Sequence, residues 1–200
     1  MIQLSYQTAS ELFNSKNYAF FKGNYNLNLF AIRSKNSTIN KFDDTFFIAY
    51  DKIVNNKIDS VIESFACTVD PGDYWMINPM DPGGTAAIYP GQYRCVWKLG
   101  YFRGTKALLQ VRNFKIYRDN NKDRVFDYNP LKTTEGLYGL FMHRHFQRVN
   151  PASFVSTSSA GCVVPEDDKN MDRTILLVEN QNKAGYGTTC TFTLFEEDEL

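Results

Sequence analysis

The stretch FMHRHFQRVNPASFVSTSSAGCVVPEDD, residues 141–168, decides how the rest of the chain is interpreted. It holds both histidines of the protein, His143 and His145, and one of its four cysteines, Cys162. An apparent strand ends at His143, and a proline followed by three acidic residues at 165–168 is typical of a helix start. The pattern indicates either a cysteine nucleophile with its base, or core residues beside a serine-rich loop.

The bulk composition narrows the class of protein. Two hundred residues fit one domain and can bury a substantial core. The 22 basic and 22 acidic residues cancel, so the electrostatic footprint of a nucleic-acid binder is missing and no nucleic-acid partner is expected. The 16 Phe and 12 Tyr favour pleated sheet surfaces. No apolar run is long enough for a membrane span, and the N-terminus lacks the pattern of a signal peptide.

The cysteines do not form a recognisable metal or redox motif. Cys67, Cys95, Cys162 and Cys190 include no CxxC pair, and two histidines give a zinc site weak support. Without a secretion signal, free thiols are expected rather than disulfides. We therefore expect no metal and no cofactor.

Local patterns predict a mainly β protein with a short helix near residues 9–15 and a second helix after Cys162. A long irregular connection, rich in Pro and Gly, is expected over residues 70–93. The predicted strands cover residues 26–33, 45–51, 61–69, 93–100, 106–111, 113–119, 124–128, 136–143 and 188–195.

A polar segment between two of these strands has partial calcium-loop spacing. Asp119, Asn121, Asp123 and Asp127 place oxygen ligands at suitable positions. However, Arg124 stands where a turn glycine is expected, and the final bidentate glutamate is missing. A polar hairpin tip is the favoured interpretation, and calcium binding is the weaker alternative.

The cysteine and histidine suit nucleophilic catalysis. A histidine at hydrogen-bond distance can take the proton of Cys162, and His143 or, two residues later on the same strand face, His145 could be that base. Gly161 allows close backbone approach, and the N–H groups around it and Cys162 could stabilise an oxyanion. Ser159 could orient the loop or the imidazole, or could simply be a turn residue. The structural alternative is a buried, inert cysteine.

Two short motifs carry a resemblance to a known family. GLFMH at residues 139–143 and SAGC at residues 159–162 resemble the active-site signature of the L,D-transpeptidase catalytic domain, the YkuD-like family. Members pair a strand-borne histidine with a Ser-His-Gly-Cys segment. Residues 60–195 are similar to a divergent bacteriophage branch that carries Ser-Ala-Gly-Cys.

This resemblance implies a fold and a domain division. The expected fold is mainly β, a YkuD-like β-sandwich of mixed sheets with one helix after the catalytic cysteine and a short N-terminal helix. Residues 61–200 would form the L,D-transpeptidase-like catalytic domain. Residues 1–60 would be an N-terminal elaboration packed on the same domain.

The resemblance also implies an activity. Cys162 would attack an amide of a peptidoglycan stem peptide, His143 would accept its proton, and water or an amine would resolve the thioester. A phage-encoded enzyme would be made in the host cytoplasm and would act on the bacterial wall at lysis or as a virion component. Other virion proteins are further possible partners.

Departures from the family pattern leave the substrate open. Ala160 replaces the second histidine of the motif, and Val164 stands where many members carry Arg or Asn. Arg144, Arg148 or Arg94 could supply the missing cation.

Other side chains bear on the same question. Trp75 and Tyr93 could wall a substrate groove, or could pack the long loop onto the sheet. His145 is a further candidate for contact with the substrate. Ala160 and Val164, the departures from the family pattern, favour a different interpretation. The protein would then be a weakly active or inactive wall-binding or virion structural protein that retains the fold.

Overall fold

The computed structural model describes all 200 residues and is mainly β, with three α-helices. The helices are α1 (Tyr6–Ser15), α2 (Asp73–Ile77) and α3 (Asp168–Lys183), and a 3-10 turn, η1 (Glu197–Glu199), ends the chain. The strands are β1 (Asn28–Arg33), β2 (Asp44–Val54), β3 (Lys57–Thr68), β4 (Thr85–Ile88), β5 (Gly91–Phe102), β6 (Thr105–Gln110), β7 (Phe114–Asp119), β8 (Thr133–Gly136), β9 (Val164–Pro165) and β10 (Thr189–Glu196).

Two sheets form the framework. Seven strands make a mixed sheet in the order β6-β5-β10-β1-β2-β3-β9, and β4-β7-β8 make a smaller antiparallel sheet. Within the large sheet β1 runs parallel to β10, and the other pairs are antiparallel. The general prediction of a mainly β fold with mixed strand directions is confirmed.

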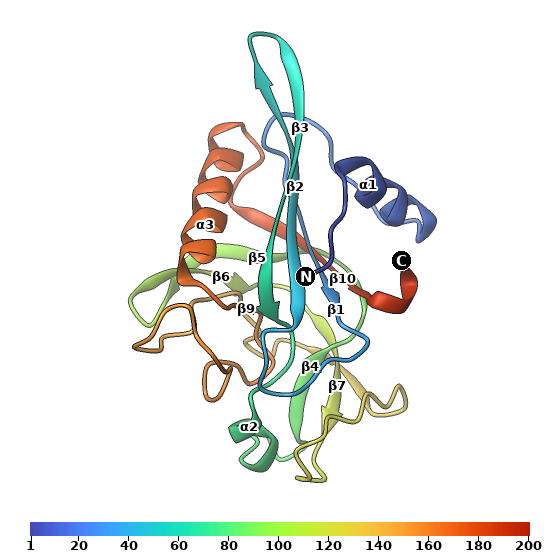
Figure 1. Cartoon of the computed structure of the whole chain (residues 1–200), viewed down its shortest axis with the longest axis vertical. Coiled ribbons are helices and arrows are strands. Elements are labelled where there is room, and N and C mark those ends of the chain that lie inside the picture. The colour runs from blue at the N-terminus through green and yellow to red at the C-terminus, as the bar shows by residue number, and fades with distance from the viewer.

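Helices cover both faces of the large sheet (Figure 1). Every residue of β1 is buried, and its side chains alternate between two cores. Phe30 packs with Phe13 of α1 on one face. Leu29 belongs to the core that includes Ile175 of α3 on the other face. A strand that is apolar on both sides is therefore central, not peripheral.

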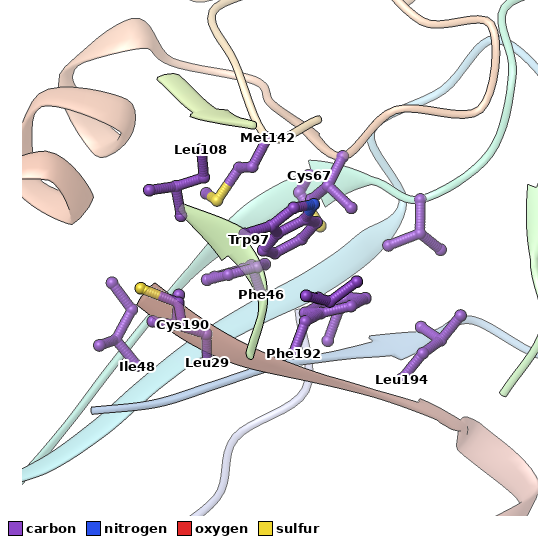
Figure 2. Close-up of a cluster of buried hydrophobic side chains, with 14 of the residues drawn as sticks. Leu29, Phe46, Ile48, Cys67, Trp97, Leu108, Met142, Cys190, Phe192 and Leu194 are labelled. Atoms are coloured by element: carbon purple, nitrogen blue, oxygen red, sulfur yellow. The ribbon is translucent and has the colours of Figure 1, made fainter. Parts of the chain in front are cut away.

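The larger core connects the sheet to the segment that carries the histidines (Figure 2). The Trp97 ring lies 4.5 Å from that of Phe192 and is fully buried. Its indole N–H donates to the Leu140 carbonyl at 2.9 Å. Cys67 and Cys190 lie in this core as free thiols, and burial raises the pKa of both. The reduced cysteines expected from the sequence are thus observed, two of them as buried core residues.

Most predicted elements are present, with two wrong strand assignments. Residues 124–128 form no strand, because β7 pairs with β8 further along the chain. In the range 136–143, Gly136 is the last residue of β8, and the rest forms only isolated bridges at Met142, since Gly139 turns the backbone at φ 73°. The connection at 70–93 contains α2 and β4, which the sequence patterns did not indicate.

The first 60 residues are not an appendage to the sheet. They supply β1 and β2, which lie in its middle between β10 and β3. A boundary at residue 60 would cut through β3, which pairs with β2 from Lys57 to Cys67. The elaboration proper is α1 with the segment before β1. No helix combines the length and apolar character needed to cross a bilayer.

A candidate cysteine–histidine site

A short parallel contact brings the two motifs together. Met142 pairs with Val163, the Val163 N–H donates to the Phe141 carbonyl at 2.9 Å, and the His143 N–H donates to the Val163 carbonyl at 3.2 Å. Met142 and Val163 are fully buried in the core. Because side chains alternate along extended chain, His143 and Cys162 lie on the other side of these two segments from Met142 and Val163. Both line the cavity, and Cys162 also packs against the edge of the core.

The loop before the cysteine is held by Ser159 and Gly161. The fully buried Ser159 hydroxyl donates to the Cys162 carbonyl at 2.8 Å and accepts the Gly161 N–H at 3.0 Å. Gly161 has φ 115°, and a Cβ there would lie 2.4 Å from the Ala86 carbonyl oxygen of β4. Ser159 therefore orients the loop and does not contact the imidazole.

The expected oxyanion pair is reduced to one donor. The Gly161 N–H is already engaged by the Ser159 hydroxyl, so it is not free for an oxyanion. The Cys162 N–H has no hydrogen-bond partner and remains as the backbone donor beside the thiol. The part of the prediction that used Gly161 as a donor is therefore wrong.

The thiol of Cys162 is held by backbone groups. Its Sγ accepts the Phe141 N–H at 3.4 Å and lies 3.6 Å from the Gly139 carbonyl, to which the S–H donates. Burial raises the pKa of the thiol to about 11, although the Phe141 N–H and the Arg103 charge oppose this effect. In the free protein the thiol is therefore protonated at neutral pH.

His143 is a neutral imidazole with one nitrogen anchored. Its Nδ1 lies 2.6 Å from the Arg144 carbonyl, and since a carbonyl can only accept, Nδ1 carries the proton. The side chain is 3 % exposed between the rings of Phe102 and Phe146. Burial lowers the pKa of His143 to about 4. Its Nε2 therefore keeps a free lone pair, as a general base requires.

Both reacting groups line one cavity of about 480 Å³. No hydrogen bond joins the Cys162 Sγ to the imidazole, so a proton would pass between them only after a side chain moves or through intervening water. The cavity wall comes from α2 and the loop after it, β4, the β5–β6 hairpin, β7 and both motif segments: Trp75, Met80, Asp81, Gly84, Thr85, Ala86, Phe102, Arg103, Arg118, Leu137, Tyr138, Gly139, Leu140, Phe141, His143, Thr157, Ser158, Ala160 and Cys162.

His145 is a structural residue and not an alternative base. Its Nδ1 accepts the Gln147 N–H at 3.0 Å, and its Nε2 lies 2.9 Å from Asn150 Oδ1. The side chain is buried and does not line the cavity. Because both ring nitrogens are occupied, His145 serves neither as base nor as a substrate contact.

Of the remaining residues predicted to contact substrate, some line the cavity and others do not. Trp75 lines the cavity, as its groove role requires. Tyr93 does not: its ring packs on Phe114 and its hydroxyl donates to the Tyr89 carbonyl. Arg144 pairs with Asp168 and Asp172 on α3, outside the cavity.

Neither of the other two arginines considered as cation lines the cavity. Arg148 is exposed, and the Arg94 guanidinium lies over the ring of Phe21. None of the three arginines that the sequence suggested as a substrate cation therefore lines the cavity.

Two arginines that the sequence patterns did not single out do line the cavity, Arg103 and Arg118. Arg118 donates to the Gly84 carbonyl at 2.7 Å and pairs with Asp81 at 3.4 Å. Arg103 precedes Gly104 in the two-residue turn between β5 and β6. The Arg-Gly pair between two predicted strands was the available signal for that turn.

The calcium candidates form a self-contained polar turn. Asp119 accepts the N–H groups of Asn121 and Asp127, and Asn121 donates to Asp123 and Asp127. Asp123 also accepts the Val125 N–H at 2.8 Å. These oxygens already have partners within the segment, which agrees with the polar-turn interpretation.

Comparisons with protein-family models, curated proteins and solved structures give no match. The functional argument therefore depends on the motif and on the geometry of the cavity.

Proposed function

We propose that this protein is a cysteine-dependent acyl-transfer enzyme that acts on peptidoglycan stem peptides. One observation carries the chemistry: Cys162 and His143 open on the same cavity, with His143 Nδ1 anchored and its Nε2 free. A thiol, a base with a fixed tautomer and an enclosed binding space are the minimum parts of a thioester mechanism. The motif resemblance supports the substrate class.

The reaction would run in two steps. The Cys162 Sγ attacks the amide carbonyl as His143 Nε2 takes the thiol proton, and the Cys162 N–H stabilises the oxyanion. Collapse breaks the C–N bond, His143 returns the proton to the leaving amine, and a thioester remains on Cys162. Water then gives the acid and free thiol by hydrolysis, or an amine gives a new amide by transpeptidation.

The setting suggested by the motif favours hydrolysis. A phage-encoded protein with this chemistry would open the wall, either at lysis or from the virion. Hydrolysis would give a stem peptide shortened by one residue, or it would cleave a cross-link. Bacterial peptidoglycan peptides are accordingly the proposed partners.

The test is mass spectrometry of purified muropeptides after incubation with wild type and with Cys162→Ala. Loss of a residue or of a cross-link with wild type alone is expected, and a mass gain from an added amino acid would instead identify transpeptidation. Cys95→Ala is the matched control, because Cys95 is also half-buried but does not line the cavity. Unchanged muropeptides from several wall types, with folded wild-type protein, would contradict an enzyme.

Specific observations favour one alternative, a wall-binding or virion structural module. The pKa of Cys162 is raised by burial to about 11, and no hydrogen bond links the thiol to the base. A module of this kind would retain muropeptides in a pull-down without changing their masses, and Cys162→Ala would bind as well as wild type.

A further inference from the structure

The cavity contains a cation that the proposed chemistry does not use. Arg103 (φ 49°) and Gly104 (φ 80°) form the two-residue turn that joins β5 to β6. Arg103 is exposed and also lines the cavity, so it lies at the open side of the space that holds Cys162.

Arg103 packs against the same two aromatic rings as His143, the proposed base. Its guanidinium lies 5.2 Å from the centroid of Phe102 and 5.5 Å from that of Phe146. The imidazole of His143 lies 4.9 Å and 5.5 Å from the centroids of the same two rings. Stacking on aromatic rings fixes a guanidinium without using its N–H donors, which remain free for a ligand.

The neighbouring arginines differ in that their charges are already matched. Arg118 pairs with Asp81, and Arg144 pairs with Asp168 and Asp172. Arg103 has no carboxylate within ion-pair distance. Among the arginines that line the cavity, it alone has a charge left for an incoming anion.

The charge of Arg103 also reaches both reacting groups. It opposes the burial that raises the pKa of Cys162, and it adds to the burial that lowers the pKa of His143. Arg103, His143 and Cys162 line the same cavity, so an anion bound to Arg103 would share that space with the scissile bond.

We propose that Arg103 binds the free carboxylate of a C-terminal residue, so that the enzyme acts as a carboxypeptidase on stem peptides that end just after the scissile amide. This inference rests on the proposed function. The terminal carboxylate is only one residue from the bond that breaks, which matches a cation beside the thiol. A planar guanidinium binds a carboxylate through two parallel hydrogen bonds.

The first test needs no natural substrate. Cys162 is alkylated with iodoacetate, which is anionic, and with iodoacetamide, which is neutral, and modification of Cys162 is followed by peptide mass spectrometry. In both reactions the thiolate displaces iodide and forms an S–C bond. Because both reagents consume the same thiolate, the ratio of their rates cancels any change in the thiol pKa.

We expect the iodoacetate-to-iodoacetamide ratio to fall by about fivefold in Arg103→Gln and to be restored in Arg103→Lys. Arg148→Gln, an exposed arginine outside the cavity, is the matched control and should keep the wild-type ratio. An equal ratio in wild type and Arg103→Gln would overturn the assignment.

The second test uses a stem tetrapeptide with a free or an amidated C-terminus. Wild type should prefer the free acid by about tenfold or more in kcat/KM, mainly through KM, and Arg103→Gln should lose that preference. If Arg103→Gln keeps the preference while turnover persists, the anchor is wrong and the proposed function stands. If wild type cleaves neither peptide but the alkylation ratio depends on Arg103, the anion site stands and the proposed function fails.

Discussion

Two polar clusters interrupt the apolar interior, and they differ in how completely their polar groups are satisfied. In the first, the buried Arg33 donates to Asp70 at 3.0 Å, to Glu196 at 2.7 Å and to the Ile88 carbonyl at 2.8 Å. Its guanidinium also lies 4.8 Å from the centroid of Tyr128. In the second, around Cys162, the His143 Nε2 and the Arg103 guanidinium have no hydrogen-bond or ion-pair partner within the protein.

This difference separates a structural cluster from a functional one. A buried polar group that finds all its partners fixes the chain: Arg33 connects β1 to the loop after β3, to β10 and to β4. A group kept without a partner beside a cavity is available to a ligand. The same contrast distinguishes the two histidines, since His145 uses both ring nitrogens and His143 uses one.

The largest expected effect is loss of turnover in His143→Asn. Asparagine keeps a donor near the Nδ1 position for the Arg144 carbonyl but supplies no base, so kcat/KM should fall by about 100- to 10,000-fold. The measurement is release of the leaving residue from a stem peptide. His145→Gln is the control: it keeps a donor for Asn150 and should leave kcat/KM within a few fold.

Equal losses of kcat/KM in His143→Asn and His145→Gln would contradict the different roles assigned to the two histidines. Circular dichroism of both variants shows whether either loss comes from unfolding.

The next effect is on stability. Arg33→Met leaves Asp70 and Glu196 without their buried partner and should lower the free energy of unfolding by about 3–5 kcal/mol. Urea denaturation measures this value. Arg173→Met is the matched control, because its ion pair with Glu63 is partly exposed and should contribute about 0–1 kcal/mol. Similar losses in both variants would remove the structural role assigned to the Arg33 cluster.

The sequence indicated the sheet better than the cavity. The stretches that became β1, β2 and β10 combine strand periodicity with strong apolar character, and such local patterns survive in the fold. The central position of β1 and β2 depends on which strands pair across the chain, and nothing local encodes that pairing. The same limit explains the wrong strand at 124–128, since β7 takes its partner from residues 133–136.

The site shows the same limit. Cys162 and His143 follow from a motif, and the structure places both on one cavity. Arg103 could not be selected from 22 basic residues, because its role depends on a hairpin turn that meets the cavity from a distant part of the chain. The occupied nitrogens of His145 likewise depend on Asn150 and Gln147, whose positions follow from the loop conformation.

Gly161→Ala tests the backbone that presents the thiol. Alanine at φ 115° is strained, and its Cβ would lie 2.4 Å from the Ala86 carbonyl oxygen, so we expect a loss of about 2–4 kcal/mol in unfolding free energy. Gly104→Ala is the control, since φ there is 80° with no atom within 4 Å of the added Cβ. Its loss should be smaller, about 1–2 kcal/mol. The reverse order would mean that Gly161 is not held against β4.

The smallest effect is a pH dependence of stability that comes from His143. Burial lowers its pKa from 6.5 to about 4, so the unfolded chain binds a proton in this range that the folded protein does not. The stabilising contribution is complete above pH 6.5 and is lost as the pH falls toward 4, by about 2 kcal/mol at about pH 5. Urea denaturation at several pH values measures this loss against His143→Asn, in which it should be missing. His143 is the histidine with one unpaired ring nitrogen. If the stabilities of wild type and His143→Asn change with pH in parallel, the imidazole of His143 is not held neutral in the folded protein. The assignment of its free Nε2 as the base would then lose its support.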